Sequence, residues 1–425
     1  MTLSWTQIVR LGLVQMCIGA IVVLMTSTLN RLMVVELALP VVLPGLLVAF
    51  HYGVQITRPN WGFLSDSGGN RTRWIIIGMA MLATGGLSAA LAIPLLETSF
   101  RAGLAVSVVA YALIGLGVGA AGTSLLALLA TATAPERRAA AATITWLMMV
   151  FGIAATAITA GQFLDPYSHG RLLAVVTVIV LGAFAVSSLS IWGIERRVIF
   201  RPAPAPMPFR QGIAEIWAER RARHFTLFVF LSMTAFFMQE LIMEPYAGLV
   251  FGFTPGESTQ MSGAQNGGVF LGMVFVGIAL SGFRIGTLRN WVVIGCLGSA
   301  GMLGAIAFAA PAGLPLVPLV LGLGLFNGVF TVAAIGSMMQ LAGQGREARE
   351  GTRMGLWGAS QAIAAGFGGL AGAALVDVLR SVLETAPAFG TTFLLQAGLF
   401  LAAAVVAVRV IDAGRAPAPA VVAGE

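Results

Sequence analysis

Long runs of apolar residues, separated by short polar segments, dominate the chain. An α-helix needs about 20 apolar residues to cross the hydrocarbon core of a membrane, and twelve runs reach that length. We predict spans at 11–34, 37–57, 74–96, 102–131, 139–162, 172–193, 225–250, 259–281, 291–310, 313–341, 354–376 and 391–411. The pattern therefore predicts an all-α, polytopic membrane protein with twelve transmembrane helices.

The composition agrees with this prediction. Of the 425 residues, 58% are hydrophobic and 10% are charged, whereas about 25% of residues are charged in a typical soluble domain. The 53 glycines suit helices that pack closely inside a bilayer. Cys17 and Cys296 both lie in apolar runs, so no disulfide framework is implied. A water-soluble enzyme, a disordered chain and a disulfide-stapled secreted domain are excluded.

The basic residues predict the orientation. All 24 are arginines, and 20 of them fall in segments on one side of the predicted membrane. The other side holds Arg31, Arg101, Arg171 and Arg380. Because arginine-rich loops stay in the cytoplasm, we expect both termini to be cytoplasmic. The arginines are spread over short loops, so we expect contact with membrane lipid and no binding of nucleic acid.

A hydrophilic segment divides the chain into two parts of six spans each. We expect an N-terminal half at 1–194, a cytoplasmic linker at 195–224, a C-terminal half at 225–411 and a disordered cytoplasmic tail at 412–425. Prolines at alternate positions make the linker a stiff spacer. Its end, from Gly212 to His224, is either a short helix on the membrane surface or a plain connection.

The two parts carry matching residues, which indicates an internal repeat. The sequence around Phe63 after span two matches that around Phe283 after span eight, and the other matched pairs are Glu136 with Glu347, Trp146 with Trp357, Gly161 with Gly372 and Asp165 with Asp377. The offsets within these pairs lie between 211 and 220 residues. Two parallel six-helix halves around a central site describe the major facilitator architecture.

The loop after span two supports this architecture. It contains Gly62 and Asp66, followed by Arg71 and Arg73, and it resembles the signature loop of the major facilitator superfamily. Asp66 can accept a hydrogen bond from an arginine and lie near a helix N-terminus, which makes the loop a candidate conformational latch. The second half has Gly286 in place of the acid, so the latch is one-sided. The alternative is a solvated polar loop.

Ionisable residues at membrane depth are costly and are therefore functional candidates. One group, Asn30, Arg31 and Glu36, lies where span one turns into span two, and a second group, Gln239, Glu240 and Glu244, lies in span seven. Glu240 and Glu244 are four residues apart and share a helical face. Spans one and seven are equivalent in the two halves, so both groups are expected at one depth. Alternatively, Arg31 pairs with Glu36 or Glu240 and has only a structural role.

His51 in span two is a third candidate, and Gln55 lies one turn further along the same face. A histidine in this position can donate a hydrogen bond to a neighbouring backbone, transfer protons or ligate a metal ion. A structural histidine with satisfied hydrogen bonds is the alternative.

Several of these segments resemble one family. The segments Asn30–Leu37, His51–Tyr52, Pro135–Arg138 and Met238–Gly248 are similar to the bacteriochlorophyll delivery branch of the major facilitator superfamily, which includes the PucC-like light-harvesting assembly proteins. In that branch an aspartate more often occupies the place of Glu240, and a glycine that of Ala247. The total length and the short loops are closer to the member encoded among bacteriochlorophyll synthesis genes than to the longer antenna-specific members.

The resemblance implies a multi-pass protein of a bacterial inner membrane that delivers bacteriochlorophyll or assists the assembly of light-harvesting complexes. The implied partners are bacteriochlorophyll or a precursor, and light-harvesting polypeptides or pigment-synthesis enzymes. The pigment would be bound transiently, with no covalent cofactor and no resident metal ion. His51 becomes a candidate axial ligand of the pigment magnesium, Gln55 a candidate donor to a ring carbonyl, and Tyr246 of the span-seven segment a further candidate contact.

Two other functions are weighed against pigment delivery: export of a small molecule and catalysis by a membrane enzyme. A proton-coupled exporter of a small molecule would use Glu240 and Glu244 as titrating groups. An enzyme that joins a prenyl diphosphate to the pigment needs two acidic clusters to hold magnesium, and only Glu240 with Glu244 forms a close pair. Redox chemistry would need a glycine-rich dinucleotide motif or a cysteine cluster, and the sequence has neither. We therefore predict that the protein is not an enzyme.

Overall fold

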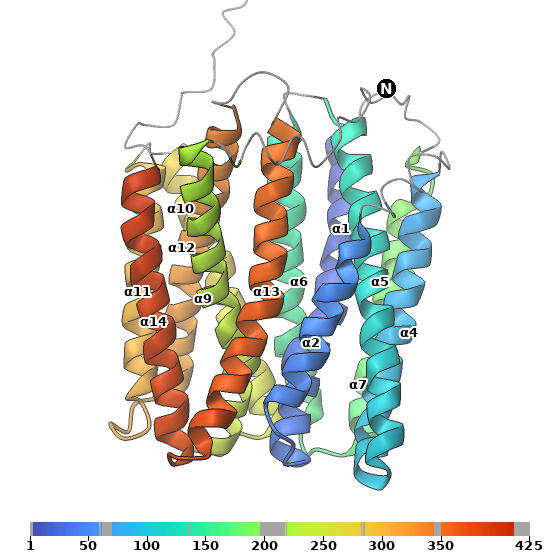
Figure 1. The fold of residues 1–425 in the computed structure, drawn as a ribbon. Coiled ribbons are helices and arrows are strands. Elements are labelled where there is room, and N and C mark those ends of the chain that lie inside the picture. Colours follow the sequence, from blue (N-terminus) through green and yellow to red (C-terminus); the bar gives the residue numbers. More distant parts are fainter. Residues whose placement is uncertain are drawn as a thin grey trace, which may run out of the picture.

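A computed structural model describes residues 3–58, 61, 70–134, 137–195, 217, 219–281, 283, 285–343 and 350–411. Within these ranges the regular structure is helical, and the helices run roughly parallel in a bundle (Figure 1). Eleven helical segments are long and apolar enough to cross a membrane, and a twelfth apolar helix, Val42–Thr57, is shorter. The predicted all-α fold with twelve apolar helices is confirmed.

The N-terminal half contains six of these segments. The first is α1 (Trp5–Val23), which continues through two π-helical turns at Leu24–Leu29 and Leu32–Glu36. The others are α2 (Val42–Val54) with a 3₁₀ turn at Gln55–Thr57, α4 (Arg71–Thr98), α5 (Phe100–Ala132), α6 (Arg138–Leu164) and α7 (His169–Ile191).

The C-terminal half repeats this arrangement. Its helices are α9 (Arg220–Phe251), α10 (Pro255–Ser281), α11 (Leu288–Ala307), α12 (Leu316–Gly343), α13 (Glu350–Arg380) and α14 (Thr385–Val410). One buried apolar cluster is built almost wholly from the first half, and a second almost wholly from the second half.

Several expected boundaries differ from the structure. Span one begins at Trp5, because Ser4 caps the helix through a hydrogen bond from the Gln7 backbone N–H. Span two begins at Val42, since the chain between Leu37 and Val41 is not helical. The surface helix expected up to His224 is wrong at its end, because the residues from Arg220 onward form the first turns of α9, continuous with span seven. Residues 212–216 and 218 of that expected helix lie outside the described residues.

Two pairs of helices join the halves: α6 packs against α10, and α2 packs against α13. Figure 1 shows α2 and α13 converging at the end of the bundle where α2 begins. We call this end, at which α1 and α13 finish and α2 and α10 begin, the arginine-poor face. The predicted loop latch lies at the other end; its Gly62 and Asp66 are outside the described residues.

Candidate functional site at the interface between the two halves

The polar end of α1 is shaped by its two π-helical turns. Such turns are rare and often mark functional sites. Their backbone bonds join residues five apart, as in the 3.1 Å bond from the Leu37 N–H to the Leu32 carbonyl. This geometry also brings Arg31 and Glu36 together, and their side chains form a 2.5 Å ion pair. Of the two partners expected for Arg31, the structure therefore selects Glu36.

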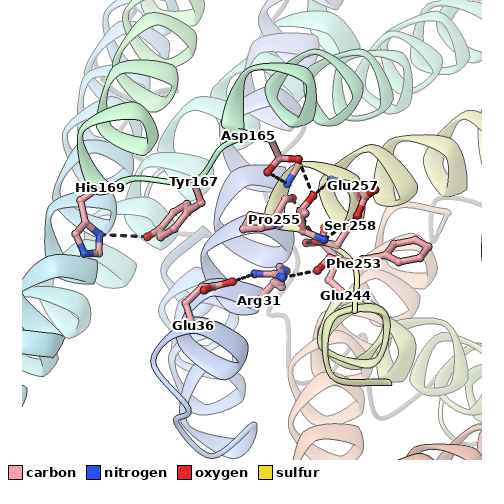
Figure 2. A network of polar contacts seen from close by, with 12 residues as sticks. Arg31, Glu36, Asp165, Tyr167, His169, Glu244, Phe253, Pro255, Glu257 and Ser258 are labelled. Atoms are coloured by element: carbon pink, nitrogen blue, oxygen red, sulfur yellow. Dashed lines mark hydrogen bonds and ion pairs between the residues drawn. The ribbon is translucent and has the colours of Figure 1, made fainter. Parts of the chain in front are cut away.

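Arg31 also binds the second half of the molecule. Its Nη2 donates a 2.6 Å hydrogen bond to the carbonyl oxygen of Phe253, just beyond the end of α9 (Figure 2). The side chain is only 2% exposed, whereas that of Glu36 is 33% exposed. A carboxylate and a carbonyl oxygen take Nη1 and Nη2 of this buried guanidinium, whereas its Nε has no partner among the described residues.

Asn30, which is fully buried, forms a second contact between the halves. Its amide nitrogen donates a 2.8 Å hydrogen bond to the carbonyl oxygen of Leu241 in α9. That carbonyl has no ordinary helical partner, because the residue four positions later is Pro245, which lacks an N–H. In a membrane every backbone polar group needs a partner inside the protein. Asn30 therefore completes the hydrogen bonding of a helix in the opposite half.

Glu244 lies beside this contact and is 1% exposed. Its carboxylate accepts hydrogen bonds from two hydroxyls of α10, Ser262 at 2.5 Å and Ser258 at 3.4 Å. Nearby, the hydroxyls of Thr28 and Thr259 bond each other across the halves at 3.2 Å. The region around Glu244 is thus a buried, oxygen-rich centre at the junction of α1, α9 and α10.

Glu240, one turn earlier on α9, is half-buried. The hydroxyl of Thr26, on the first π-helical turn of α1, donates to the Val22 carbonyl at 3.3 Å and lies near the Glu240 carboxylate. Asn30 bonds the Leu241 carbonyl and Arg31 the Phe253 carbonyl, so the span-one group contacts the segment that carries Glu240 and Glu244. Their common depth in the membrane stays a prediction.

His51 and Gln55 form a separate group. His51 is 1% exposed, and its Nε2 lies 2.9 Å from the amide nitrogen of Gln55. The Gln55 oxygen accepts a hydrogen bond from the Arg58 guanidinium. The Gln55 amide is a donor in this arrangement, so His51 Nε2 is the acceptor and Nδ1 carries the proton. That buried Nδ1 has no hydrogen-bond partner among the described residues.

Two further candidates from span seven face the interior of their own half. Gln239 accepts a 3.3 Å hydrogen bond from Gln396 of α14. Tyr246 donates a 3.0 Å hydrogen bond to the Ile306 carbonyl of α11 and packs against Phe389 and Phe393. Within the described part of the chain, these two residues tie α9 to α11 and α14.

Two residues of the predicted latch, Arg71 and Arg73, are described by the structure and lie in the first turn of α4. The backbone N–H groups of Arg71 and Thr72 donate to the carboxylate of Glu195, at 2.8 and 2.9 Å, and the Arg73 N–H donates to the side chain of Asn70. Glu195, at the end of the first half, thus occupies the N-terminus at which a carboxylate was expected.

A small polar network lies at the arginine-poor face. His169 Nε2 is 2.9 Å from a Glu97 oxygen, and its Nδ1 is 3.2 Å from the Tyr167 hydroxyl, as Figure 2 shows for the tyrosine. Burial raises the pKa of Tyr167 to about 12, and the charges of Glu36 and Glu97 contribute to that rise. The phenol is therefore neutral at physiological pH and can donate to His169.

Some residues of the site were missed by the sequence analysis. They are the hydroxyls that face the two glutamates, the amide that binds Gln239, and the carboxylate that caps α4: Thr26, Thr28, Ser258, Thr259, Ser262, Gln396 and Glu195. Ser258 and Ser262 are four residues apart in span eight, and this spacing was a signal that both face one neighbour. No group of three or more histidine, cysteine, aspartate or glutamate side chains suited to a metal ion occurs among the described residues.

Comparison with solved structures defines the class of protein. The fold matches the nucleoside transporter NupG with a TM-score of 0.68 at 13% identity, covering 95% of this chain and 98% of that one. It matches a D-xylose–proton symporter with a TM-score of 0.70 at 15% identity, covering 96% and 98%. The chain is a polytopic helical membrane protein with the major facilitator fold.

The family follows from sequence. The family model described as "PUCC protein" matches residues 28–415, so the chain belongs to that family. It is 63% identical to the "Bacteriochlorophyll synthase 44.5 kDa chain" of Rhodobacter capsulatus over the whole of both chains. It is 29% identical to "Protein PucC" of Cereibacter sphaeroides, over 90% of this chain and 84% of that one. The predicted membership of the PucC-like branch is confirmed.

Proposed function

We propose that the protein is a carrier-like membrane protein that handles bacteriochlorophyll, either by delivering it or by assisting the assembly of pigment–protein complexes. Two findings support the proposal: the membership of the PUCC protein family and the names of the relatives. The observation that carries the mechanism is a pair of contacts across the halves: Asn30 bonds Leu241 of α9, and Arg31 bonds Phe253, two residues beyond α9. Asn30 and Leu241 belong to segments that resemble the family signatures, so these segments bind each other.

The family signature segments therefore build the junction at which two halves of a carrier would move. Each half has its own large apolar cluster, and the junction combines a small apolar cluster of Val150, Val269 and Met273 with hydrogen bonds to hydroxyl, amide and carbonyl groups. Net hydrogen bonds between transmembrane helices contribute only about 0.6–1.7 kcal/mol each. Such a junction can be broken and remade more easily than a continuous apolar core.

His51 is the candidate ligand for the pigment magnesium. It is a neutral imidazole in an apolar zone, and its Nδ1 has no partner among the described residues. Ligation through Nε2 requires that the Gln55 amide move away, and a movable amide suits transient binding. Pigment released by this rearrangement would be passed to light-harvesting polypeptides or pigment-synthesis enzymes, in a bacterial inner membrane with both termini cytoplasmic.

The test is the absorption spectrum of purified protein loaded with bacteriochlorophyll. His51→Ala should lose bound pigment, His51→Gln should retain part of it with a shifted long-wavelength band, and Gln55→Ala should retain it. The matched control is His224→Ala. His224 is exposed in the first turns of α9, where its Nδ1 lies 2.7 Å from the Arg220 carbonyl oxygen. Unchanged pigment and band position in both His51 variants at equal yield would refute ligation by His51.

We propose that the protein is not itself an enzyme, although one relative is named a synthase. Purified protein given bacteriochlorophyllide and a prenyl diphosphate should form no esterified product unless a separate synthase is added. Steady turnover by this chain alone would overturn the proposal.

A second candidate function, proton-coupled export of a small molecule, is favoured by Glu244. Its carboxyl is buried, and its hydrogen-bond partners on α10 are hydroxyl groups. In liposomes that contain a pH-sensitive dye, an exporter should move protons on addition of substrate, and Glu244→Gln should abolish that movement. Pigment binding without any proton movement would favour the first function.

A further inference from the structure

Two aspartates join the halves at the arginine-poor face. Asp165 follows the last turn of α6, and its carboxylate accepts hydrogen bonds from the Thr254 hydroxyl at 2.6 Å and the Gly256 N–H at 3.1 Å. These donors lie at the N-terminus of α10 in the other half, as Figure 2 shows for Asp165 and Pro255.

Asp377 makes the equivalent contact with the halves exchanged. It lies in the last turn of α13, and its carboxylate accepts from the Val41 and Val42 N–H groups, at 3.1 and 2.7 Å. These groups open α2 in the first half. Because α6 and α13 are the fifth helices of their halves, and α2 and α10 the second, one contact is the pseudo-two-fold copy of the other.

The position of each aspartate within its own helix is unfavourable. A carboxylate at a helix C-terminus is repelled by the negative end of the helix dipole, whereas one at an N-terminus is attracted by the positive end and by free N–H groups. Asp165 and Asp377 each lie at the C-terminal end of their own helix and reach the N-terminal end of a helix in the other half. Their favourable electrostatic contact therefore exists only while the halves touch at this face.

The backbones are also very close beside one of these contacts. A Cβ atom placed on Gly161 would lie 2.6 Å from the Gly256 carbonyl oxygen, and a Cβ on Gly256 would lie 2.5 Å from that of Gly161. Such distances leave no room for a side chain, so the glycines allow α6 and α10 to meet where Asp165 bonds.

We propose that Asp165 and Asp377 form a symmetric pair of electrostatic locks that hold the two halves closed at the arginine-poor face. Opening this face separates each carboxylate from its helix N-terminus, and both contacts have to break together because each half carries one aspartate and one helix N-terminus that donates to the other aspartate. The inference rests on the proposed carrier function only in that the halves have to separate.

The chain supplies a matched control. Glu195 also binds two N–H groups at a helix N-terminus, those of Arg71 and Thr72, but both partners belong to the first half. Removing its charge weakens the same kind of contact without affecting the junction between the halves.

The test measures access of a reagent to the junction in lipid nanodiscs. Both faces of a nanodisc contact the solution, so the measurement needs neither a defined orientation of the protein nor bound pigment. A single reporter cysteine replaces buried Thr28, which bonds Thr259 across the halves, in a Cys17→Ala, Cys296→Ala background. Its labelling rate with a hydrophilic maleimide reports opening. Asp165→Asn with Asp377→Asn should raise the rate about tenfold, since each helix-end charge contributes a modest attraction. Each single variant should raise it less, and Glu195→Gln should leave it within about twofold.

An unchanged labelling rate in the double variant, with wild-type thermal stability, would overturn the proposal, as would an equal rise in Glu195→Gln. If the double variant does not fold, Asp165→Cys with Thr254→Cys gives a second test. With Asp377 intact, oxidation of that pair should suppress labelling at position 28, and reduction should restore it; labelling that ignores the cross-link would also overturn the proposal. Neither labelling readout depends on pigment binding. Failure of the proposed locks can therefore be distinguished from failure of the proposed pigment-handling function.

Discussion

The amide nitrogen of Asn30 lies 2.8 Å from the carbonyl oxygen of Leu241, and this bond replaces the helical bond that Pro245 cannot make. The consequence is an interdependence between two halves whose large apolar clusters are separate. An unpaired carbonyl in the membrane is costly, so loss of the asparagine affects α9 as well as α1.

A double-mutant cycle tests this relationship. Asn30→Ala should lower the free energy of unfolding by about 1–2 kcal/mol, because the Leu241 carbonyl then lacks a partner. In a Pro245→Ala background the loss should be smaller, since the backbone N–H restored at position 245 can bond Leu241. Urea unfolding in detergent provides the measurement. As a control, Asn266→Ala, which removes a bond within α10, should cost the same in both backgrounds.

Arg31 holds two acceptors with different parts of its guanidinium, and a lysine cannot reproduce that geometry. We therefore expect Arg31→Ala and Arg31→Lys both to reduce the amount of protein in the membrane and the melting temperature. Hydrogen bonds to charged groups contribute about 1.5–3 kcal/mol each. Glu36→Gln should have a smaller effect, because Glu36 is partly exposed and the Phe253 carbonyl still binds the arginine. Normal accumulation of Arg31→Ala would show that this arginine is dispensable.

Glu244 is expected to tolerate an amide better than a methyl group. Glu244→Gln keeps the volume and an oxygen that can accept from Ser262, so the melting temperature should change little. Glu244→Ala leaves a void and removes the acceptor of the Ser262 hydroxyl, whereas Ser258 keeps the Pro255 carbonyl. A buried polar group without a partner costs about 1–3 kcal/mol. The prediction fails if both variants are equally unstable in thermal unfolding.

Side chains at the α6–α10 contact are expected to be harmful in proportion to their size. Gly161→Ala and Gly256→Ala should each destabilise the closed junction, because the new Cβ would lie under 3.0 Å from backbone oxygen. At Gly182 in α7 an added methyl group would meet no atom within 4 Å, so Gly182→Ala should be neutral or slightly stabilising. Melting temperatures of the three variants decide the matter.

The raised pKa of Tyr167 predicts a dependence on alkaline pH. The folded protein keeps this phenol protonated up to about pH 12, whereas a tyrosine in the unfolded chain ionises near its ordinary pKa of 10.0. Stability should therefore be lost as the pH rises from about 10 to 12. Tyr167→Phe removes this contribution, so between pH 9 and 11 the variant should lose less stability than the wild type.

The sequence predicted the helices well because about twenty consecutive apolar residues leave few alternatives in a membrane. The polar groups of spans one and seven were found for the same reason, since charges at that depth are costly. The partner of Asn30 could not be predicted. Pro245 frees the carbonyl of Leu241, but nothing in the identity of Leu241 itself indicates a free carbonyl. For Arg31 the sequence left Glu36 and Glu240 open as partners. The choice of Glu36 depends on a π-helical turn, whose five-residue spacing is absent from an ordinary helical pattern.

The roles of Asp165 and Asp377 show a different limit. Both were recognised as matched positions in the repeat, but their contacts need the relative placement of the halves, which no local pattern contains. Serine and threonine near Glu244 were passed over because hydroxyls are common in transmembrane helices and carry no charge.

The short helix α2 has a consequence for the surrounding lipid. Val42–Thr57 rises only about 24 Å at 1.5 Å per residue, and the hydrocarbon core of a bilayer is about 30 Å thick. Several of its large side chains, among them Leu46, Phe50 and Ile56, are exposed and so face the acyl chains. The bilayer beside α2 has to become thinner to match this short helix. Membrane thickness therefore affects α2 more than the longer helices. In thicker lipids the mismatch should be larger, and it should destabilise the end of the molecule at which α2 begins.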